Sequence, residues 1–517
     1  MATPSEKLAE SLKALQELQE RGVVAVKSSY LSRTHKERLV ENGFLKEVMK
    51  GWYIPSGPDE KAGDSTAWYA SFWDFCAAYL EERFGTEWCL SPEQSLSLHA
   101  SNRAVPRQLL ARTPKGGNKP TNLPHDTSLL ELRAALPATG HEAQIDGLRV
   151  FSLPASLIFC APGFFLQNPT DTRVALSMIR DGSEVLGLLL DGGRSKVAGR
   201  LAGAFRNIRR DKIADQILSA MRAAMYKVEE VDPFEKKPAF VIPIREPSPF
   251  VSRIQLMWQT MREPVIENFP TAPGISKDTK PYLKAVENVY VLDAYHSLSI
   301  ENYRVSRELI ERVRSGSWNP VTEGKDQEDR NALAARGYWQ AFQAVKESLQ
   351  KILANQNAGA VADEDHGDWY QELFGPSVVA GLLEPADLAG YRSNQVYIRR
   401  SMHMPPKHEA VVDCIETLFE LLKEEEDASV RVVLGHFMFV YIHPYMDGNG
   451  RIGRFLMNLM LASGGYPWTV IPVEERDDYM AALESASVNQ DVVPFAKFLG
   501  GLVKNGLEGN PLVKAPE

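Results

Sequence analysis

A chain of 517 residues exceeds what one compact hydrophobic core usually organises, so we expect two to four domains. Its 44% hydrophobic and 24% charged residues are ordinary for a globular protein and argue against a disordered, fibrous or membrane-spanning one. The net charge of −9 provides no global positive field, so binding of nucleic acid would require a local basic patch.

Neither export nor cysteine chemistry is indicated. The first 22 residues carry Leu at helical spacing and lack the apolar core of a signal peptide, and no apolar run approaches the roughly 20 residues that span a bilayer. We therefore expect a cytoplasmic protein. No CxxC or Cys/His ligand spacing occurs, so we expect four core thiols rather than a zinc site or disulfides. These are Cys76, Cys89, Cys160 and Cys414.

Residues 7–56 have the order helix, short helix, helix and hairpin. Ser32 can cap a helix that runs through Val40, Gly43 can end it, and LKEVMKGWYIP indicates two strands about a Lys50–Gly51 turn. This order predicts a winged helix-turn-helix over residues 1–58. The stretch resembles the N-terminal module of AbiEi-type antitoxins and related bacterial regulators.

That resemblance implies DNA binding by basic residues around the second long helix. The candidate DNA-binding residues are Lys27, Arg33, Lys36 and Arg38. Residues 65–231 look like the α+β continuation of the same family, and a second basic cluster lies between residues 194 and 212. Because charge runs are usually solvated faces, a DNA-binding and a purely structural interpretation stay open for both patches.

The clearest domain boundary is the proline-rich segment 232–249. Five prolines deny it a regular helix and hold it extended, which indicates a linker, although a long strand or loop would have a similar composition. After it the pattern is helical almost throughout. A helix can start at Pro406, and apolar stripes at helical spacing follow it. The stripes are Val411, Ile415, Leu418, Phe419 and Leu422; Val432, Val433, Phe437, Val440 and Tyr441; and Ile452, Phe455, Leu456, Leu459 and Met460.

The last two stripes bracket the glycine-rich loop HPYMDGNGRIGR, residues 443–454. Its glycines let backbone N–H groups turn inward just before a helix, which favours an anion. Arg451 and Arg454 share a helix face and can reach further phosphates, and Asp447 is a hard oxygen ligand suited to Mg²⁺. His443 is a candidate general base. Each feature alone is more often a turn or a solvated face, but together they predict a triphosphate site.

The loop resembles the signature of the Fic family, HPFxDGNGRxxR, with Glu also allowed at the Asp position. Every polar residue of the signature is present, and Tyr445 replaces the usual Phe. The likeness extends over about residues 280–500. It implies an all-α Fic core with a β-hairpin flap within residues 250–505, so the whole chain is expected to be multidomain, with the winged helix-turn-helix and the α+β region in front.

This resemblance implies roles for particular residues of the loop and of the flap. His443 would deprotonate a hydroxyl of a protein substrate, and Asp447 would hold Mg²⁺ with ATP as co-substrate. The nucleotide would be bound by Gly448, Asn449, Gly450, Arg451 and Arg454. The flap residues Val396, Tyr397 and Ile398 would dock an extended target segment by strand addition. The implied reaction is transfer of AMP to a Tyr, Ser or Thr hydroxyl.

A second Fic-like element lies upstream, in a helix expected at about residues 285–305. Ser297, Glu301 and Asn302 fit the family's inhibitory pattern, which is Ser or Thr, three residues, Glu, then Gly or Asn. In the family this Glu pairs with the second arginine of the loop, here Arg454, and takes the place of the γ-phosphate. The resemblance therefore implies an autoinhibited adenylyltransferase.

Two alternatives stay open. The same loop could transfer another phosphate-containing group, or the chain could be a DNA-binding regulator or antitoxin whose Fic part senses nucleotide without turnover. The expected partners are a protein substrate, which could be the chain itself, and DNA at the winged helix, with no membrane partner. Whether the chain forms a homodimer is left open.

Overall fold

The computed structural model describes residues 3–58, 60, 63–235, 248–317 and 330–510. The chain forms two compact units, Met1–Arg253 with Tyr397–Met404, and Ile254–Val396 with Pro405–Glu517. Most of the expected linker 232–249 lies outside the described residues. Within the described ranges, no helix combines the length and apolar character needed to cross a membrane.

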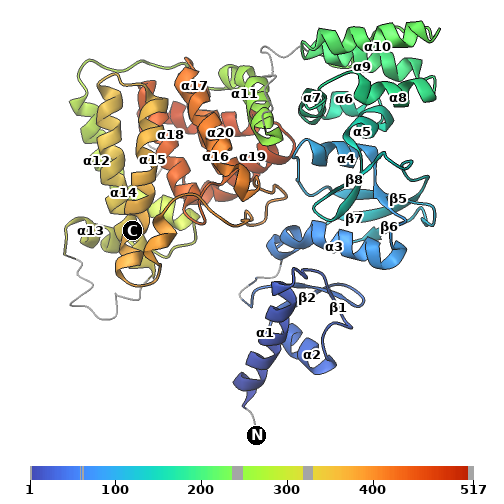
Figure 1. Ribbon diagram of the computed structural model, residues 1–517. Helices are drawn as coiled ribbons and strands as arrows, with labels where there is room; N and C mark the ends of the chain where they lie inside the picture. Colours follow the sequence, from blue (N-terminus) through green and yellow to red (C-terminus); the bar gives the residue numbers. More distant parts are fainter. Residues whose placement is uncertain (1–2, 59, 61–62, 236–247, 318–329, 511–517) are drawn as a thin grey trace. The chain divides into compact units, whose positions relative to one another are not determined.

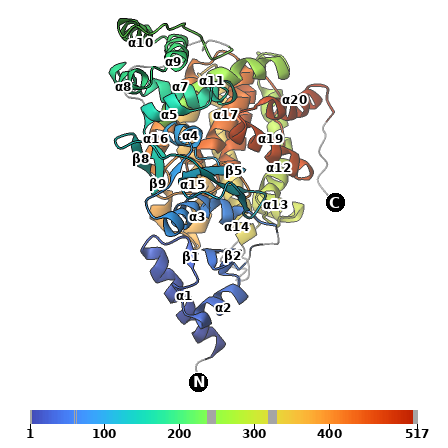
Figure 2. The same ribbon diagram turned by 90° about the vertical axis from the view of Figure 1, so that its right-hand side faces the viewer.

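The first unit begins with a helix, a short strand, a second helix and a hairpin (Figure 2). Their bounds are α1 Pro4–Glu20, β1 Val26–Lys27, α2 Arg33–Glu41, β2 Leu45–Met49 and β3 Trp52–Pro55. Ser32 caps α2, Gly43 follows its end with φ 77°, and the hairpin turns at Gly51 with φ 83°, as the sequence predicts. The three strands pair in the order β1-β3-β2.

The short helix expected between α1 and α2 is absent. Residues 21–32 form turns and the strand β1 instead. Gly22, at φ 76°, ends the preceding helix, and the β-branched residues that follow it favour pairing with β3 over a new helix. The element order resembles a winged helix-turn-helix only in part, so that fold stays a prediction.

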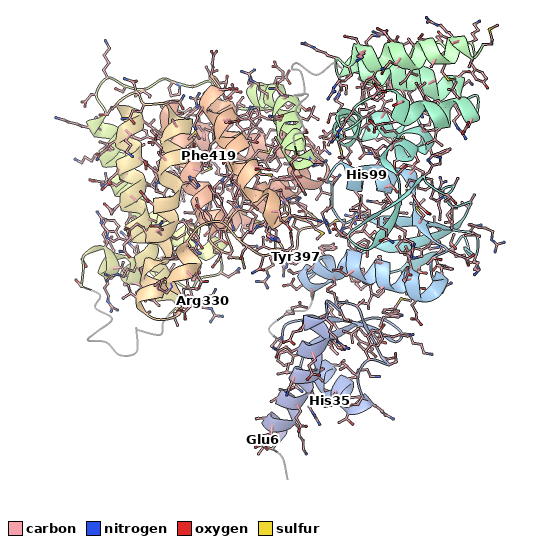
Figure 3. All side chains as sticks on the ribbon, viewed as in Figure 1. Glu6, His35, His99, Arg330, Tyr397 and Phe419 are labelled. Atoms are coloured by element: carbon pink, nitrogen blue, oxygen red, sulfur yellow. The ribbon has the colours of Figure 1, made fainter. Side chains whose placement is uncertain are left out.

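The rest of the first unit combines small sheets with helices. Its elements are α3 Thr66–Phe84, β4 Cys89–Leu90, α4 Pro92–His99, β5 Gln108–Thr113, β6 Pro120–Asn122, β7 Ser128–Arg133, β8 Glu142–Ile145, β9 Leu148–Phe151, α5 Leu153–Phe159, α6 Phe164–Gln167, α7 Pro169–Ser177, α8 Ser183–Asp191, α9 Ser195–Asn207 and α10 Asp211–Ala223. The four-stranded sheet has the order β4-β5-β7-β6, with β5 and β7 parallel. His99, labelled in Figure 3, hydrogen bonds through Nε2 to the Phe151 carbonyl at 2.8 Å and ties α4 to the β8–β9 hairpin. As expected, all four cysteines are buried and free.

Residues Tyr397–Met404 also belong to the first unit. The Arg399 guanidinium donates to Oδ2 of Asp64 from Nε at 3.0 Å and from Nη2 at 2.9 Å. The Val105 N–H donates to the carbonyl of Met402 at 2.9 Å. Side-chain and backbone contacts thus attach this excursion of the chain to residues 64–105.

In the described part of the second unit, helices are the only regular secondary structure. Its elements are α11 Pro249–Asn268 (whose first turns lie in the first unit), α12 Lys280–Ile300, α13 Arg307–Arg314, α14 Arg330–Leu353, α15 Ala358–Val379, α16 Val411–Glu424, α17 Ala428–Ile442, α18 Asn449–Ser463, α19 Arg476–Val488, α20 Val493–Leu507 and the 3₁₀ turns Pro385–Leu388, His408–Ala410 and Val473–Glu475. Helices α14 and α15 pack along each other, as do α17 and α18 (Figure 1). At Gly337 an added Cβ would lie 1.9 Å from the Leu373 carbonyl, so a glycine is needed for the close approach of α14 to α15.

The apolar stripes predicted for α16, α17 and α18 form the core of this unit. Phe419, labelled in Figure 3, is fully buried, and of the fifteen stripe residues only Val440 is more than marginally exposed. The first of these helices starts at Val411 rather than at Pro406, after the turn His408–Ala410. The Lys407 backbone is extended, with φ −59° and ψ 149°, and the Pro406 carbonyl accepts from Arg392, so no helical turn forms at Pro406.

Candidate active site

The glycine-rich loop connects α17 to α18, the two helices predicted to bracket it. His443 ends α17 in the left-handed conformation, with φ 54° and ψ 61°. Gly448 precedes α18 with φ 81°, and a Cβ there would lie 2.7 Å from the Phe374 ring. Only glycine fits both the backbone and the space. The loop therefore turns tightly, and the first N–H groups of α18 have no partner within the helix.

Asn449 holds this loop from within. Its Oδ1 accepts from the Tyr445 N–H and its Nδ2 donates to the Tyr445 carbonyl, both at 2.8 Å. The Tyr445 ring stacks on Tyr370 at 3.9 Å between centroids, which gives a physical role to the aromatic position of the motif. Asn449 is 1% exposed and its side chain is engaged by the loop itself, so that side chain is not available to a phosphate.

We expect Asn449→Ala to destabilise the unit that contains it by about 2 kcal/mol, because two hydrogen bonds are lost and the Tyr445 backbone groups stay buried. For a unit of this size that corresponds to a fall in Tm of roughly 4–8 °C in calorimetry. Asn449→Asp keeps the acceptor for the Tyr445 N–H but places a buried carboxylate oxygen against the Tyr445 carbonyl, so it should lose at least as much. A Tm for Asn449→Ala within a degree of the parent would contradict this role.

His443 projects a half-buried imidazole beside the loop. Its Nδ1 lies 3.2 Å from the Val440 carbonyl, which can only accept, so Nδ1 carries the proton and Nε2 presents a lone pair. Burial lowers the pKa of His443 to about 4, and the nearby Arg392 acts in the same direction. The side chain is therefore neutral at pH 7, which is the form a general base requires.

Asp447 lies at the outer edge of the loop. Its side chain is 60% exposed, and its Oδ1 accepts from the Gly448 N–H at 2.6 Å. One exposed carboxylate beside an anion site fits Mg²⁺, which is commonly held by one or two carboxylates together with substrate phosphates. Among the described residues, no group of three or more His, Cys, Asp or Glu side chains forms a protein-only metal site.

The two arginines of the loop are both buried, Arg451 at 1% and Arg454 at 4% exposure. Arg451 lies over the rings of Tyr303 and Phe374, 5.1 and 5.0 Å from their centroids. Within the described part of the chain, Nε and Nη2 of Arg451 and Nη1 of Arg454 have no hydrogen-bond partner. Buried donors of this kind are costly unless a ligand satisfies them, which supports a site for an anion.

Arg454 is bound to the end of α12. Its Nε donates to Ser297 Oγ at 2.9 Å, and its Nη2 donates to the Ser297 carbonyl at 3.0 Å and to Glu301 Oε1 at 2.8 Å. Burial disfavours the charged carboxylate, but Arg454 and Arg451 outweigh it and hold the pKa of Glu301 below its usual value. A Cβ at Gly450 would lie 2.3 Å from Glu301 Oε1, so this carboxylate covers the first turn of α18.

The expected helix 285–305 is too long at its C-terminal end, because α12 stops at Ile300 and Glu301 is its C-cap. Asn302 is left-handed with φ 65°, its N–H donates to the Ser299 carbonyl, and the Tyr303 N–H donates to the Leu298 carbonyl. This is a Schellman ending. It explains physically why the pattern takes Gly or Asn after Glu, since those residues tolerate the left-handed conformation.

The predicted β-hairpin flap is wrong in its secondary structure. Residues 391–407 are all described and contain turns and bends but no strand. Arg400 is left-handed with φ 61°, and the Gln395 side chain donates to the carbonyl of Pro405 at 3.1 Å. Two prolines without N–H groups and carbonyls already bound to side chains leave too few backbone groups for a strand ladder.

Of the three expected docking residues, Val396 is buried, Ile398 is half-buried, and Tyr397, labelled in Figure 3, is 39% exposed. Target docking at this segment stays a prediction. The sequence interpretation missed Arg392, which donates from Nε to the His443 carbonyl at 2.8 Å. It also missed the rings of Tyr303 and Phe374 beside Arg451.

The candidate DNA-binding residues are largely engaged within the protein. Lys27 pairs with Glu82, and Arg33 pairs with Glu37 at 2.7 Å. Arg38 donates to the Lys7 carbonyl at 2.6 Å and to Ser11 Oγ at 2.8 Å, so it joins α2 to α1. Lys36 lies over the Tyr53 ring, 5.7 Å from its centroid. DNA binding by this module stays a prediction.

Comparison with known proteins identifies part of the second unit. Residues 364–461 match the family model described as Fic/DOC family. The protein adenylyltransferase Fic of Drosophila mojavensis is 34% identical over 259 residues, which are 49% of this chain and 48% of that protein. The protein adenylyltransferase fic-1 of Caenorhabditis elegans is 24% identical over 220 residues, 42% of this chain and 40% of that protein. A solved structure of Fic-1 from C. elegans aligns with a TM-score of 0.37 and 18% identity, covering 66% of this chain and 97% of that one.

The chain spans less than half the length of these two curated relatives. The family match runs from α15 to α18 and includes the whole loop from His443 to Arg454. Residues 364–461 are therefore a Fic domain of the Fic/DOC family.

Proposed function

We propose that this chain is an autoinhibited protein adenylyltransferase, which transfers AMP from ATP to a hydroxyl of a protein. The observation that carries the proposal is the pair of buried arginines beside the N-terminus of α18, next to a neutral His443, each with a side-chain donor that lacks a hydrogen-bond partner among the described residues. The family match and the similarity to proteins named adenylyltransferases support it.

In the proposed reaction the hydroxyl oxygen attacks the α-phosphorus of ATP. A new O–P bond forms, the bond from the α-phosphorus to the bridging oxygen breaks, and pyrophosphate leaves. Nε2 of His443 accepts the hydroxyl proton, since Nδ1 is engaged with the Val440 carbonyl. The backbone N–H groups of Asn449 and Gly450 and the guanidinium of Arg451 stabilise the negative charge.

Asp447 would hold Mg²⁺ together with the phosphates, and the ion when bound would supply further charge neutralisation at the leaving pyrophosphate. Its exposed carboxylate at the rim of the loop supports this assignment. Arg454 would bind the outer phosphate once Glu301 is displaced, because one guanidinium cannot serve both anions with the same geometry.

A labelling experiment tests the proposal. The Glu301→Gly variant is incubated with lysate of the expression host and with ATP labelled on either the α- or the γ-phosphate. We expect label in protein from the α-position alone, and mass spectrometry should find AMP on a Tyr, Ser or Thr side chain. Label from the γ-position would indicate phosphate transfer, and stronger labelling from UTP would indicate another nucleotide.

The pH dependence of the same variant follows from His443. The reactive base is the neutral imidazole, whose pKa is lowered to about 4 by burial, so the base is available throughout the neutral range. Glu301 is a negative charge that raises the pKa of His443, so its removal in this variant cannot raise that pKa further. We expect kcat/KM, which reports the free enzyme, to stay level from pH 8 to 6 and to fall only as the pH approaches about 4. Half-loss near the ordinary histidine value of about 6.5 would contradict this environment.

The rival interpretation, a regulator that senses nucleotide without turnover, predicts binding of ATP by this variant with no labelled protein. A complete loop, in which Nδ1 rather than Nε2 of His443 is engaged by the Val440 carbonyl, favours the enzyme.

A further inference from the structure

Arg392 is a buried guanidinium, 3% exposed, whose hydrogen bonds go to backbone carbonyls. Its Nε donates to the His443 carbonyl at 2.8 Å and its Nη1 to the Asn394 carbonyl at 3.0 Å. Its Nη2 donates to the Pro406 carbonyl and, at 3.5 Å, lies close to the Ile442 carbonyl. Its own N–H donates to the Pro444 carbonyl at 2.9 Å. One residue thus binds both the catalytic loop and the segment 394–406.

The position of this guanidinium at the end of α17 has a physical reason. The last carbonyls of a helix lack partners within the helix and carry partial negative charge, so a cation there is stabilising. His443 is also left-handed, a strained conformation for a non-glycine residue that persists only where its surroundings enforce it. Arg392 binds the carbonyls on either side of that strained residue.

The imidazole of His443 is therefore defined by two separate contacts. The Val440 carbonyl determines the rotation of the ring, and Arg392 determines where the His443 backbone lies. Asn449 holds the loop at its other end, through Tyr445. Loss of the Arg392 contact would leave the ring oriented but free to shift, and a displacement of about 1 Å can lower a rate by roughly 10²-fold.

We propose that Arg392 is a positioning residue for His443 and that the same guanidinium fixes Asn394 and Pro406 to the backbone of that loop. This inference rests on the proposed AMP transfer. Arg392 acts through the His443 backbone, with its donors taken by carbonyls rather than left for nucleotide.

The test uses the full chain carrying Glu301→Gly, with Arg392→Lys, Arg392→Met or the control Arg400→Met added. Arg400 lies in the same excursion and contributes its backbone N–H to Thr66, which the substitution retains. We expect Arg392→Met to lower kcat roughly 10²-fold and Arg392→Lys roughly tenfold, because an ammonium keeps the charge but lacks the planar fork that reaches several carbonyls. KM for ATP should change less than about twofold in both, and Arg400→Met should match the parent. Unchanged kcat in Arg392→Met would overturn the proposal.

A second measurement does not depend on activity. NMR of ¹⁵N-labelled histidine, with the His443 signal assigned through His443→Ala, follows this imidazole in each variant. The charges that act on it are Arg392 from the segment before Asn394, Glu301 from α12 and Asp447 from the loop. Removing the positive charge in Arg392→Met should raise the pKa of His443. Arg392→Lys keeps the charge, so the pKa should stay the same while the ¹⁵N chemical shift of His443 changes. Identical His443 signals and pKa in all variants would overturn the proposal even if no transferase activity is found. Shifted signals in a protein without activity would contradict the proposed function and leave the positioning role supported.

Discussion

Replacing His443 by alanine is expected to lower AMP transfer by roughly 10²–10⁴-fold, which is the range for loss of a general base. The structure gives the reason, because Nδ1 is tied to the Val440 carbonyl and only Nε2 can accept a proton. The measurement is transfer of α-labelled phosphate in the Glu301→Gly background, together with the Kd for ATP. That Kd should change little, since the phosphates are assigned to the α18 N-terminus and the arginines.

Two further variants make this result specific. His443→Asn lacks the base yet tolerates the left-handed backbone, so it should be as inactive as His443→Ala with a Tm near that of the parent. His408→Ala removes a histidine from the turn His408–Ala410 of the same unit and should transfer AMP at the parental rate. AMP transfer at near-parental rates by both His443 variants would contradict the assignment of His443 as the general base.

Glu301→Gly is expected to raise AMP transfer by roughly 10- to 150-fold over the parent chain. In the parent, Glu301 occupies Nη2 of Arg454 at 2.8 Å and covers the first turn of α18 at Gly450. A hydrogen bond between charged groups contributes about 1.5–3 kcal/mol, and every 1.4 kcal/mol corresponds to a factor of ten. Removing the carboxylate returns Arg454 to the nucleotide, so the α-phosphate can align for attack.

The variant should fold, because Glu301 is the C-cap of α12 rather than an interior helix residue, so glycine costs little there. Glu301→Gln keeps the size but loses the charge and should activate less. Asn302→Gly is the matched control, since glycine also adopts the left-handed ending and leaves the carboxylate in place; its activity should equal that of the parent. Equal labelling by the parent and Glu301→Gly would show that Glu301 only caps a helix.

Features defined by neighbouring residues were predictable from the sequence. The cap at Ser32, the turn at Gly51 and the apolar stripes of α16, α17 and α18 depend on residue identity and on spacing within a few turns. The errors lie where such local signals compete. The absent helix before α2 and the absent hairpin at 391–407 were decided by strand pairing with β3 and by side chains that bind backbone carbonyls.

By itself the sequence located the candidate loop, because its glycines, His443, Asp447 and the two arginines stand within twelve residues at the junction of two helices. It also indicated the Glu301–Arg454 pair through resemblance, across 153 residues. Only the tertiary structure decided how that loop is held. Arg392 lies 51 residues before His443 and binds carbonyl oxygens, which every residue possesses. A side chain that binds backbone carbonyls needs no particular residue type at its partner position and no fixed spacing from it. The sequence therefore contains no pattern that indicates the contact, and only the folded chain shows it.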